Sequence, residues 1–185
     1  WQWYGNRRPL EESYASMKRY AEYLGKSEGR LLTYGLGDWY DIGPGNPGQS
    51  KLTPLGVTAT ASYYADLRTL VGTAQLLGHT ADAKTFADQA GQVREAFQKA
   101  FYQAEQNTYA TSSQTALAMP LVLGLAPESA RPGLLEKLVA GIRERGNHTS
   151  AGDIGYTYVI QALLAGGRSD TLFDMTNRTD APSYG

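Results

Sequence analysis

The chain has 185 residues, 42% of them hydrophobic and 19% charged, with a formal net charge of -1 at pH 7. This length and composition suit one globular domain and argue against disorder, while the charge gives no electrostatic case for nucleic acid or an anionic membrane as a partner. With no cysteine and two histidines, disulfides, thiolate nucleophiles and cysteine-ligated zinc are excluded, and we predict no metal site and no cofactor.

Helical periodicity dominates the sequence. From Pro9 onward, apolar residues recur at intervals of three and four and predict a helix that ends near Gly25. The same pattern predicts six more helices, over residues 58–77, 80–100, from 112 or 113 to 123, 134–146, 158–164 and 169–175. Gly78 is expected to end the second helix, Thr80 to cap the third and Pro120 to kink the fourth. The few strands should be short and flank the turn signal at 105–107.

The predicted connections alternate between tight turns and long loops, which cover residues 25–54, 101–112, 146–155 and the tail from 176. In a ring of helical hairpins such loops gather at one rim. We therefore predict an all-α fold, a partial (α/α)6 toroid of antiparallel helical hairpins with a few short strands in its loops. Seven helices are roughly half of the twelve that six hairpins need. Residues 1–185 are thus interpreted as a single-domain fragment, whose uncovered helix faces favour either the missing half of the toroid or self-association as a partner.

The loop at 34–45 holds the densest group of candidate binding residues. It contains Asp38, Trp39 and Asp41 in a backbone freed by glycines. A sugar presents an apolar face of C–H groups and a rim of hydroxyls, so its pocket needs a flat aromatic ring with acceptors at the edge. These three residues supply that set. A structural alternative is equally compatible with the spacing: Trp39 fills the core and Asp38 caps a turn.

A second loop, residues 145–156, holds His148 and Asp153, which are candidates for binding substrate hydroxyls. The simpler interpretation is that Gly146 ends one helix and Asp153 caps the next. Ser150 lacks the strand and elbow that would expose a serine nucleophile. The glycines near residue 36 lack the third glycine and the helix of a nucleotide-binding loop.

These loops resemble the catalytic toroid of bacterial alpha-L-rhamnosidases, glycoside hydrolases with a six-hairpin helical barrel. The matching segments extend over nearly the whole chain: residues 10–14 with Met17, Lys18 and Tyr20, then 35–41 (Gly-Leu-Gly-Asp-Trp-Tyr-Asp), 52–54, 152–156 and 177–185. One departure is Asn6, which follows Gly5 where an acidic residue is more usual in the family. Related toroids that act on other sugars also place an aromatic residue in the Gly-Asp-Trp loop.

The resemblance implies removal of a terminal alpha-L-rhamnose with inversion, in which one carboxylic acid protonates the leaving oxygen and a second carboxylate activates water. In the family, the acid lies upstream of the region that begins this chain, and the base is a Glu followed shortly by Trp, downstream of the Pro-Ser-Tyr-Gly stretch. Neither motif occurs here, so the catalytic residues are unknown and the isolated chain is expected to be inactive. The resemblance transfers Trp39 as a pocket-lining residue, with Asp38 and Asp41 as its polar companions.

The predicted partner is a rhamnose-containing glycoside, and neither nucleic acid nor a membrane is expected to bind. Three competing functions stay open: a glycosidase toroid for another sugar, glucoamylase-like or arabinosidase-like; a non-catalytic helical-hairpin array that binds protein partners; and a carbohydrate-binding remnant without chemistry. The compartment is unknown, with a soluble protein of the bacterial cytoplasm, the periplasm or the exterior all compatible with the sequence.

Overall fold

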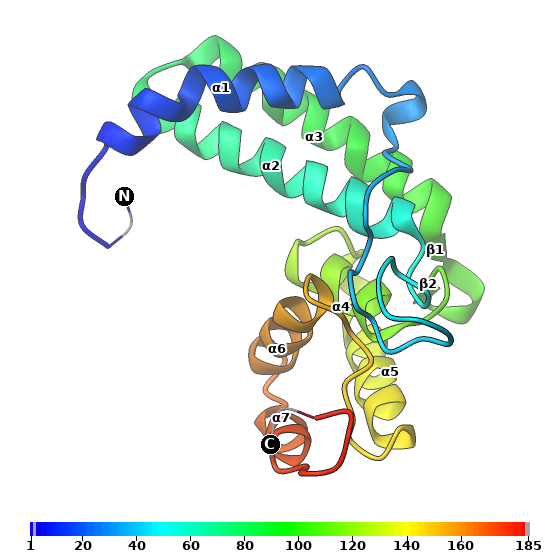
Figure 1. Cartoon of the computed structure of the whole chain (residues 1–185). Coiled ribbons are helices and arrows are strands. Elements are labelled where there is room, and N and C mark those ends of the chain that lie inside the picture. Colours follow the sequence, from blue (N-terminus) through cyan, green and yellow to red (C-terminus); the bar gives the residue numbers. More distant parts are fainter. Residues whose placement is uncertain (2, 184–185) are drawn as a thin grey trace.

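The computed structural model describes residue 1 and residues 3–183, and helices dominate this part of the chain (Figure 1). The seven α-helices found there are α1 (Arg8–Leu24), α2 (Leu55–Leu77), α3 (Thr80–Phe101), α4 (Gln114–Val122), α5 (Arg131–Glu144), α6 (Gly155–Ala165) and α7 (Ser169–Thr176). Two short strands, β1 (Tyr102–Gln103) and β2 (Thr108–Tyr109), pair antiparallel with Tyr102 opposite Tyr109. Short 3-10 turns occupy Glu28–Arg30, Ala104–Gln106 and Glu128–Ala130. The all-α prediction is confirmed.

The ends of the helices test the predicted caps. Gly78 ends α2 in the left-handed conformation, at φ 81°, as a C-terminal glycine should. The Ser113 side chain caps α4 by accepting a hydrogen bond from the Ala116 N–H at 3.1 Å. The predicted caps at Thr80 and Asp153 are wrong, because His79 and Ile154 occupy those N-cap positions and neither gives a side-chain cap.

Burial separates the helices into an inner and an outer layer. In α4, every residue from Gln114 to Pro120 is buried, and α2 also buries residues around most of its circumference. Helices that are buried on all sides belong to the interior, whereas α1 buries only Tyr14, Ala21 and Leu24. The inner α4 packs against both α2 and α6, while α1 and α3 cover α2 and α5 covers α4. Figure 1 shows the resulting two arms, α1 to α3 and α4 to α7.

Helices α2, α4 and α6 each begin after a long segment, at Leu55, Gln114 and Gly155. Their leading segments meet in space: the Thr111 hydroxyl donates to the Leu52 carbonyl oxygen at 2.6 Å, and the Ile42 N–H donates to the Ser150 carbonyl oxygen at 3.0 Å. The long loops therefore gather at one rim, beside the N-termini of α2, α4 and α6, as the alternation of loop lengths predicts.

Two further findings apply to the described residues alone. None of the helices there has the length and apolar character needed to cross a membrane. The same residues hold no cluster of three or more acidic or histidine side chains suited to a metal ion. Tyr184 and Gly185, which end the last motif of the family resemblance, lie outside the described residues.

Candidate functional site

Asp38 anchors the loop that precedes α2. Its side chain is fully buried, and three donors surround the carboxylate. The Thr115 hydroxyl and the Gly152 N–H donate to Oδ2, the latter at 2.9 Å, and the Gly155 N–H donates to Oδ1 at 2.7 Å. A buried charge is tolerated only where such donors replace water. Asp38 thus ties its own loop to α4 and to the start of α6.

The two glycines of the 152–155 segment are required by this close approach. A Cβ on Gly155 would lie 1.9 Å from Thr115 Oγ1, and one on Gly152 would lie 2.2 Å from the Trp39 carbonyl oxygen. Both distances are far below a permitted contact, so only glycine lets the backbone reach the Asp38 carboxylate. The two glycines of this motif, which carries part of the family resemblance, therefore have a packing reason.

Asp41 connects the start of the same loop to its later part, residues 50–52. It is buried, and its carboxylate accepts hydrogen bonds from the Lys51 N–H at 2.8 and 2.9 Å, from the Leu52 N–H at 2.6 Å and from the Ser50 hydroxyl at 2.9 Å. The oxygens of Asp38 and Asp41 thus face donors of the chain itself. We call these two carboxylates, with Thr115, Gly152 and Gly155, the Asp38 frame.

Trp39 lies on this frame and is half-buried. Its indole meets the Tyr40 ring edge to face, with centroids 5.4 Å apart and an interplanar angle of 72°. Tyr40 has a left-handed backbone, at φ 63°, and its N–H donates to the Gly48 carbonyl oxygen at 2.8 Å. The loop therefore turns sharply after the indole, which stays partly accessible instead of being sealed in the core.

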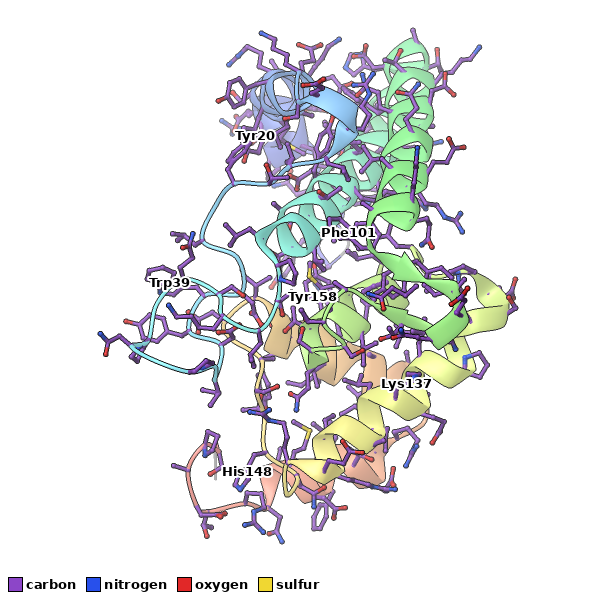
Figure 2. The ribbon with its side chains drawn as sticks, turned by 90° about the vertical axis from the view of Figure 1, so that its right-hand side faces the viewer. Tyr20, Trp39, Phe101, Lys137, His148 and Tyr158 are labelled. Atoms are coloured by element: carbon purple, nitrogen blue, oxygen red, sulfur yellow. The ribbon has the colours of Figure 1, made fainter. Side chains whose placement is uncertain are left out.

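The two candidate residues of the second predicted loop, residues 145–156, lie in different places. Asp153 lies beside Trp39, because its N–H donates to the Trp39 carbonyl oxygen at 2.8 Å, and its side chain is exposed. His148 instead contacts the tail: Nδ1 lies 2.9 Å from the Pro182 carbonyl oxygen and Nε2 lies 3.4 Å from Asp180 Oδ2. Figure 2 shows Trp39 and His148 well apart. The structure thus brings four of the five predicted site residues together and leaves His148 aside.

The hydrogen bond from Arg178, at 2.6 Å, is the main cause that lowers the pKa of Asp180 below its ordinary value. The carboxylate beside His148 is therefore ionised at neutral pH. This contact joins the 146–155 loop to the tail, at a distance from the indole.

Sequence reasoning missed two polar residues of α4 that support the rim. Thr115 donates to Asp38, while Gln114 donates to the His148 carbonyl oxygen at 3.0 Å and accepts from the Ser150 N–H at 2.9 Å. Both residues are buried at the start of an otherwise apolar helix. Two polar residues at the start of an apolar helix could have indicated this role from the sequence, because a buried polar side chain needs a hydrogen-bond partner.

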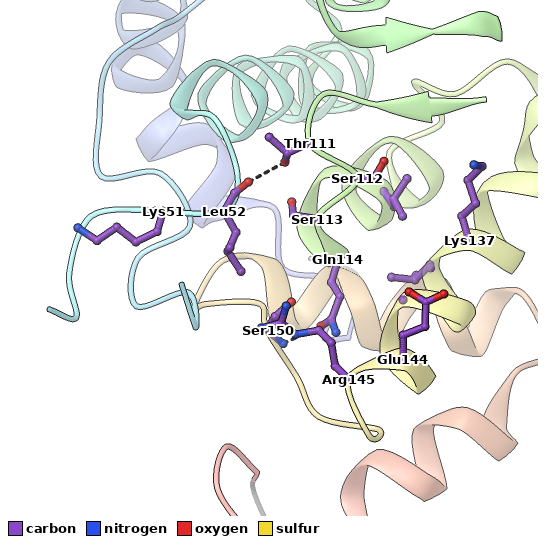
Figure 3. A pocket seen from close by; sticks show the side chains of 13 residues that line it. Lys51, Leu52, Thr111, Ser112, Ser113, Gln114, Lys137, Glu144, Arg145 and Ser150 are labelled. Carbon is purple, nitrogen blue, oxygen red and sulfur yellow. Dashed lines mark hydrogen bonds between the residues drawn. The ribbon is translucent and has the colours of Figure 1, made fainter. Parts of the chain in front are cut away.

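A hollow of about 420 Å³ lies on the α5 side of the rim (Figure 3). Its lining includes residues 51–52, the segment leading into α4, Lys137 and Glu144 of α5, and Arg145 directly after that helix. None of the residues that line it is one of the five predicted site residues. The hollow is therefore distinct from the surface around the indole.

Comparisons with known proteins give a consistent result. The model of the bacterial alpha-L-rhamnosidase six-hairpin glycosidase domain matches residues 1–185. An alpha-L-rhamnosidase of Streptomyces avermitilis is 31% identical over 189 residues, which cover 100% of this chain and 17% of that protein. The crystal structure of a Streptomyces avermitilis alpha-L-rhamnosidase complexed with L-rhamnose has a TM-score of 0.88 at 29% identity, covering 98% of this chain and 17% of its own.

A second solved structure, an alpha-L-rhamnosidase from Dictyoglumus thermophilum, has a TM-score of 0.91 at 32% identity and covers 98% of this chain. This chain covers 21% of it. The chain therefore spans about a fifth of the length of these relatives.

Proposed function

Because the chain belongs to the bacterial alpha-L-rhamnosidase six-hairpin glycosidase domain family, we propose that it forms part of the rhamnose-binding wall of an inverting alpha-L-rhamnosidase. The observation that carries this proposal is the half-buried indole of Trp39, held at the loop rim by two buried carboxylates. A rigidly placed, partly accessible aromatic ring is the surface that the apolar face of a sugar requires.

Each residue has a defined part in this proposal. Trp39 packs against the C–H face of the sugar, and the exposed Asp153 carboxylate accepts hydrogen bonds from its hydroxyls. Asp38 and Asp41 act as positioning residues, since their oxygens are engaged by donors of the chain. His148 supports the site by holding the tail against the 146–155 loop.

The chemistry of this proposal is inverting hydrolysis, with the acid and the base supplied by other segments of the enzyme. An inverting pair requires carboxyl groups roughly 6.5–9.5 Å apart, so that a water molecule fits between the base and the sugar. The present segment contributes binding, orientation of the ring and exclusion of water from one side of it. We accordingly expect no hydrolysis by the chain on its own.

A binding experiment with matched variants tests the proposal. Ligand-detected NMR of the chain with L-rhamnose, D-glucose and L-arabinose should show a preference for L-rhamnose, and Trp39→Ala should abolish the signal. Trp3→Ala is the control, because Trp3 is 89% exposed and remote from the Asp38 frame in sequence. A preference for D-glucose or L-arabinose would favour the toroid for another sugar, and equal loss in both variants would refute the role of Trp39.

A further inference from the structure

A second hollow, of about 350 Å³, shares no lining residue with the hollow beside α5. It is bounded by α1, α2, the 34–37 segment and the residue before α6, and we call it the α2 hollow. The lining residues used below are Tyr20, Tyr34, Leu36, Tyr63, Asp66 and Ile154. It adjoins the proposed rhamnose site along the chain, because 34–37 leads directly into Asp38 and Trp39.

Exposed aromatic and aliphatic side chains gather in the α2 hollow. Tyr20 is 57% exposed, Tyr34 53%, Leu36 60% and Ile154 42%. Figure 2 shows Tyr20 and Trp39 toward the same edge of the molecule. Side chains of this size cost free energy when left in water, and an exposed apolar group rimmed by polar atoms marks a binding surface.

Asp66 adds an acceptor without a partner. The charged residues of α2 are Asp66 and Arg68. Arg68 donates to the Tyr64 hydroxyl at 3.2 Å and lies over that ring, whereas Asp66 makes no hydrogen bond or ion pair with any residue in the described part of the chain. The sequence already sets Asp66 and Arg68 apart, because the other residues of this long helix carry no charge.

The environment of Asp66 is concave. Its side chain is accessible to solvent, yet the surrounding protein removes enough water to raise its pKa above the ordinary 3.8. Burial raises the pKa of Tyr158 in α6, and the negative charge of Asp66 raises it further. Asp66 also lines the α2 hollow together with Ile154, the residue before α6, so a ligand bound there would meet protein on several sides.

We propose that the α2 hollow is a second subsite, which binds the sugar unit to which the rhamnose is attached, with Asp66 accepting hydrogen bonds from its hydroxyls. This proposal rests on the proposed function, because it places the leaving group beside Trp39. The exposed Tyr20 and Tyr34 supply amphipathic ring faces for the C–H groups of that unit. Asp66 supplies an acceptor that a neutral, hydroxylated ring can satisfy, whereas an apolar protein surface placed on it would leave a charge buried and unpaired.

The test compares two ligands and two carboxylate variants. An alpha-L-rhamnosyl-D-glucose disaccharide and L-rhamnose are titrated into the chain while its amide NMR spectrum is recorded. We expect the disaccharide to bind at least about fivefold more tightly, since a hydrogen bond to a charged group is added. The additional shifts should lie at the lining residues of the α2 hollow. Asp66→Asn should remove this gain and leave the affinity for L-rhamnose unchanged.

Matched variants separate the possible outcomes. Asp88→Asn, which changes an exposed carboxylate on the outer α3, should leave the gain intact, and Tyr20→Ala should reduce it without disturbing the fold. Equal affinities for the two ligands, or a gain that survives Asp66→Asn, would overturn the subsite while leaving the role of Trp39 standing. A gain seen only with an aryl alpha-L-rhamnoside would overturn the sugar assignment. Binding of neither ligand would overturn both proposals.

Discussion

Replacing Asp38 by alanine should destabilise the chain more than any other single change in the loop that precedes α2. The substitution removes the acceptor of three hydrogen bonds and leaves the Thr115 hydroxyl and the N–H groups of Gly152 and Gly155 buried without partners. Each unsatisfied buried donor costs about 1–3 kcal/mol. Because part of that cost is relieved by relaxation or by entering water, we expect the free energy of unfolding to fall by about 3–5 kcal/mol.

The assay is urea unfolding followed by circular dichroism, with Asp153→Asn as the matched control. Asp153 lies beside the same frame, but its carboxylate is exposed, so the control should change the free energy of unfolding by less than about 0.5 kcal/mol. Thr115→Val should fall between the two, since it removes one of the three donors. If Asp38→Ala and Asp153→Asn gave the same midpoint and slope, the Asp38 frame would not be what holds the rim together.

Three further predictions follow from the same structure. Gly155→Ala should lower the free energy of unfolding by more than about 3 kcal/mol, because its Cβ would lie 1.9 Å from Thr115 Oγ1. Gly141→Ala, with open space around the new Cβ, should instead stabilise α5 by about 0.5–1 kcal/mol. Thermal unfolding of the two variants checks this contrast. Because the pKa of Asp66 is raised in the folded chain, its contribution to stability is fully present below pH 3.8 and is lost as the pH rises through the folded-state pKa. The Asp66→Asn variant should therefore gain stability relative to the parent chain as the pH rises. A difference in the free energy of unfolding that stays constant across that pH range would contradict this. The chain alone should not hydrolyse an aryl alpha-L-rhamnoside, and turnover that is lost on Trp39→Ala would disprove the assignment of the acid and base to other segments.

Local sequence rules predicted the helices well because their information is local. Apolar spacing gave the existence of every helix, and Gly78 ended α2 as its conformational freedom predicts. The start of α3 at Thr80 was predicted correctly, but the cap was not, because His79 occupies the N-cap position. The start of α2 was earlier than predicted, at Leu55, directly after Pro54.

The site was only partly predictable, because its decisive contacts are distant in sequence. Asp38 meets its donors 77, 114 and 117 residues further along the chain, so spacing could not tell an outward-facing carboxylate from a buried one. The partner of His148 was equally hidden, since the tail returns to it from 180–182. By contrast, Trp39 and Asp153 could be identified as candidates from their glycine-rich surroundings, and the structure places them side by side.

The central claim is that the indole of Trp39 forms the floor of the rhamnose site. The most direct measurement follows the indole N–H resonance of each tryptophan by NMR during a titration with L-rhamnose. The account predicts a saturable shift of the Trp39 resonance, with those of Trp1 and Trp3 unchanged. A Trp39 resonance that stays fixed while amides elsewhere in the chain shift with L-rhamnose would contradict it.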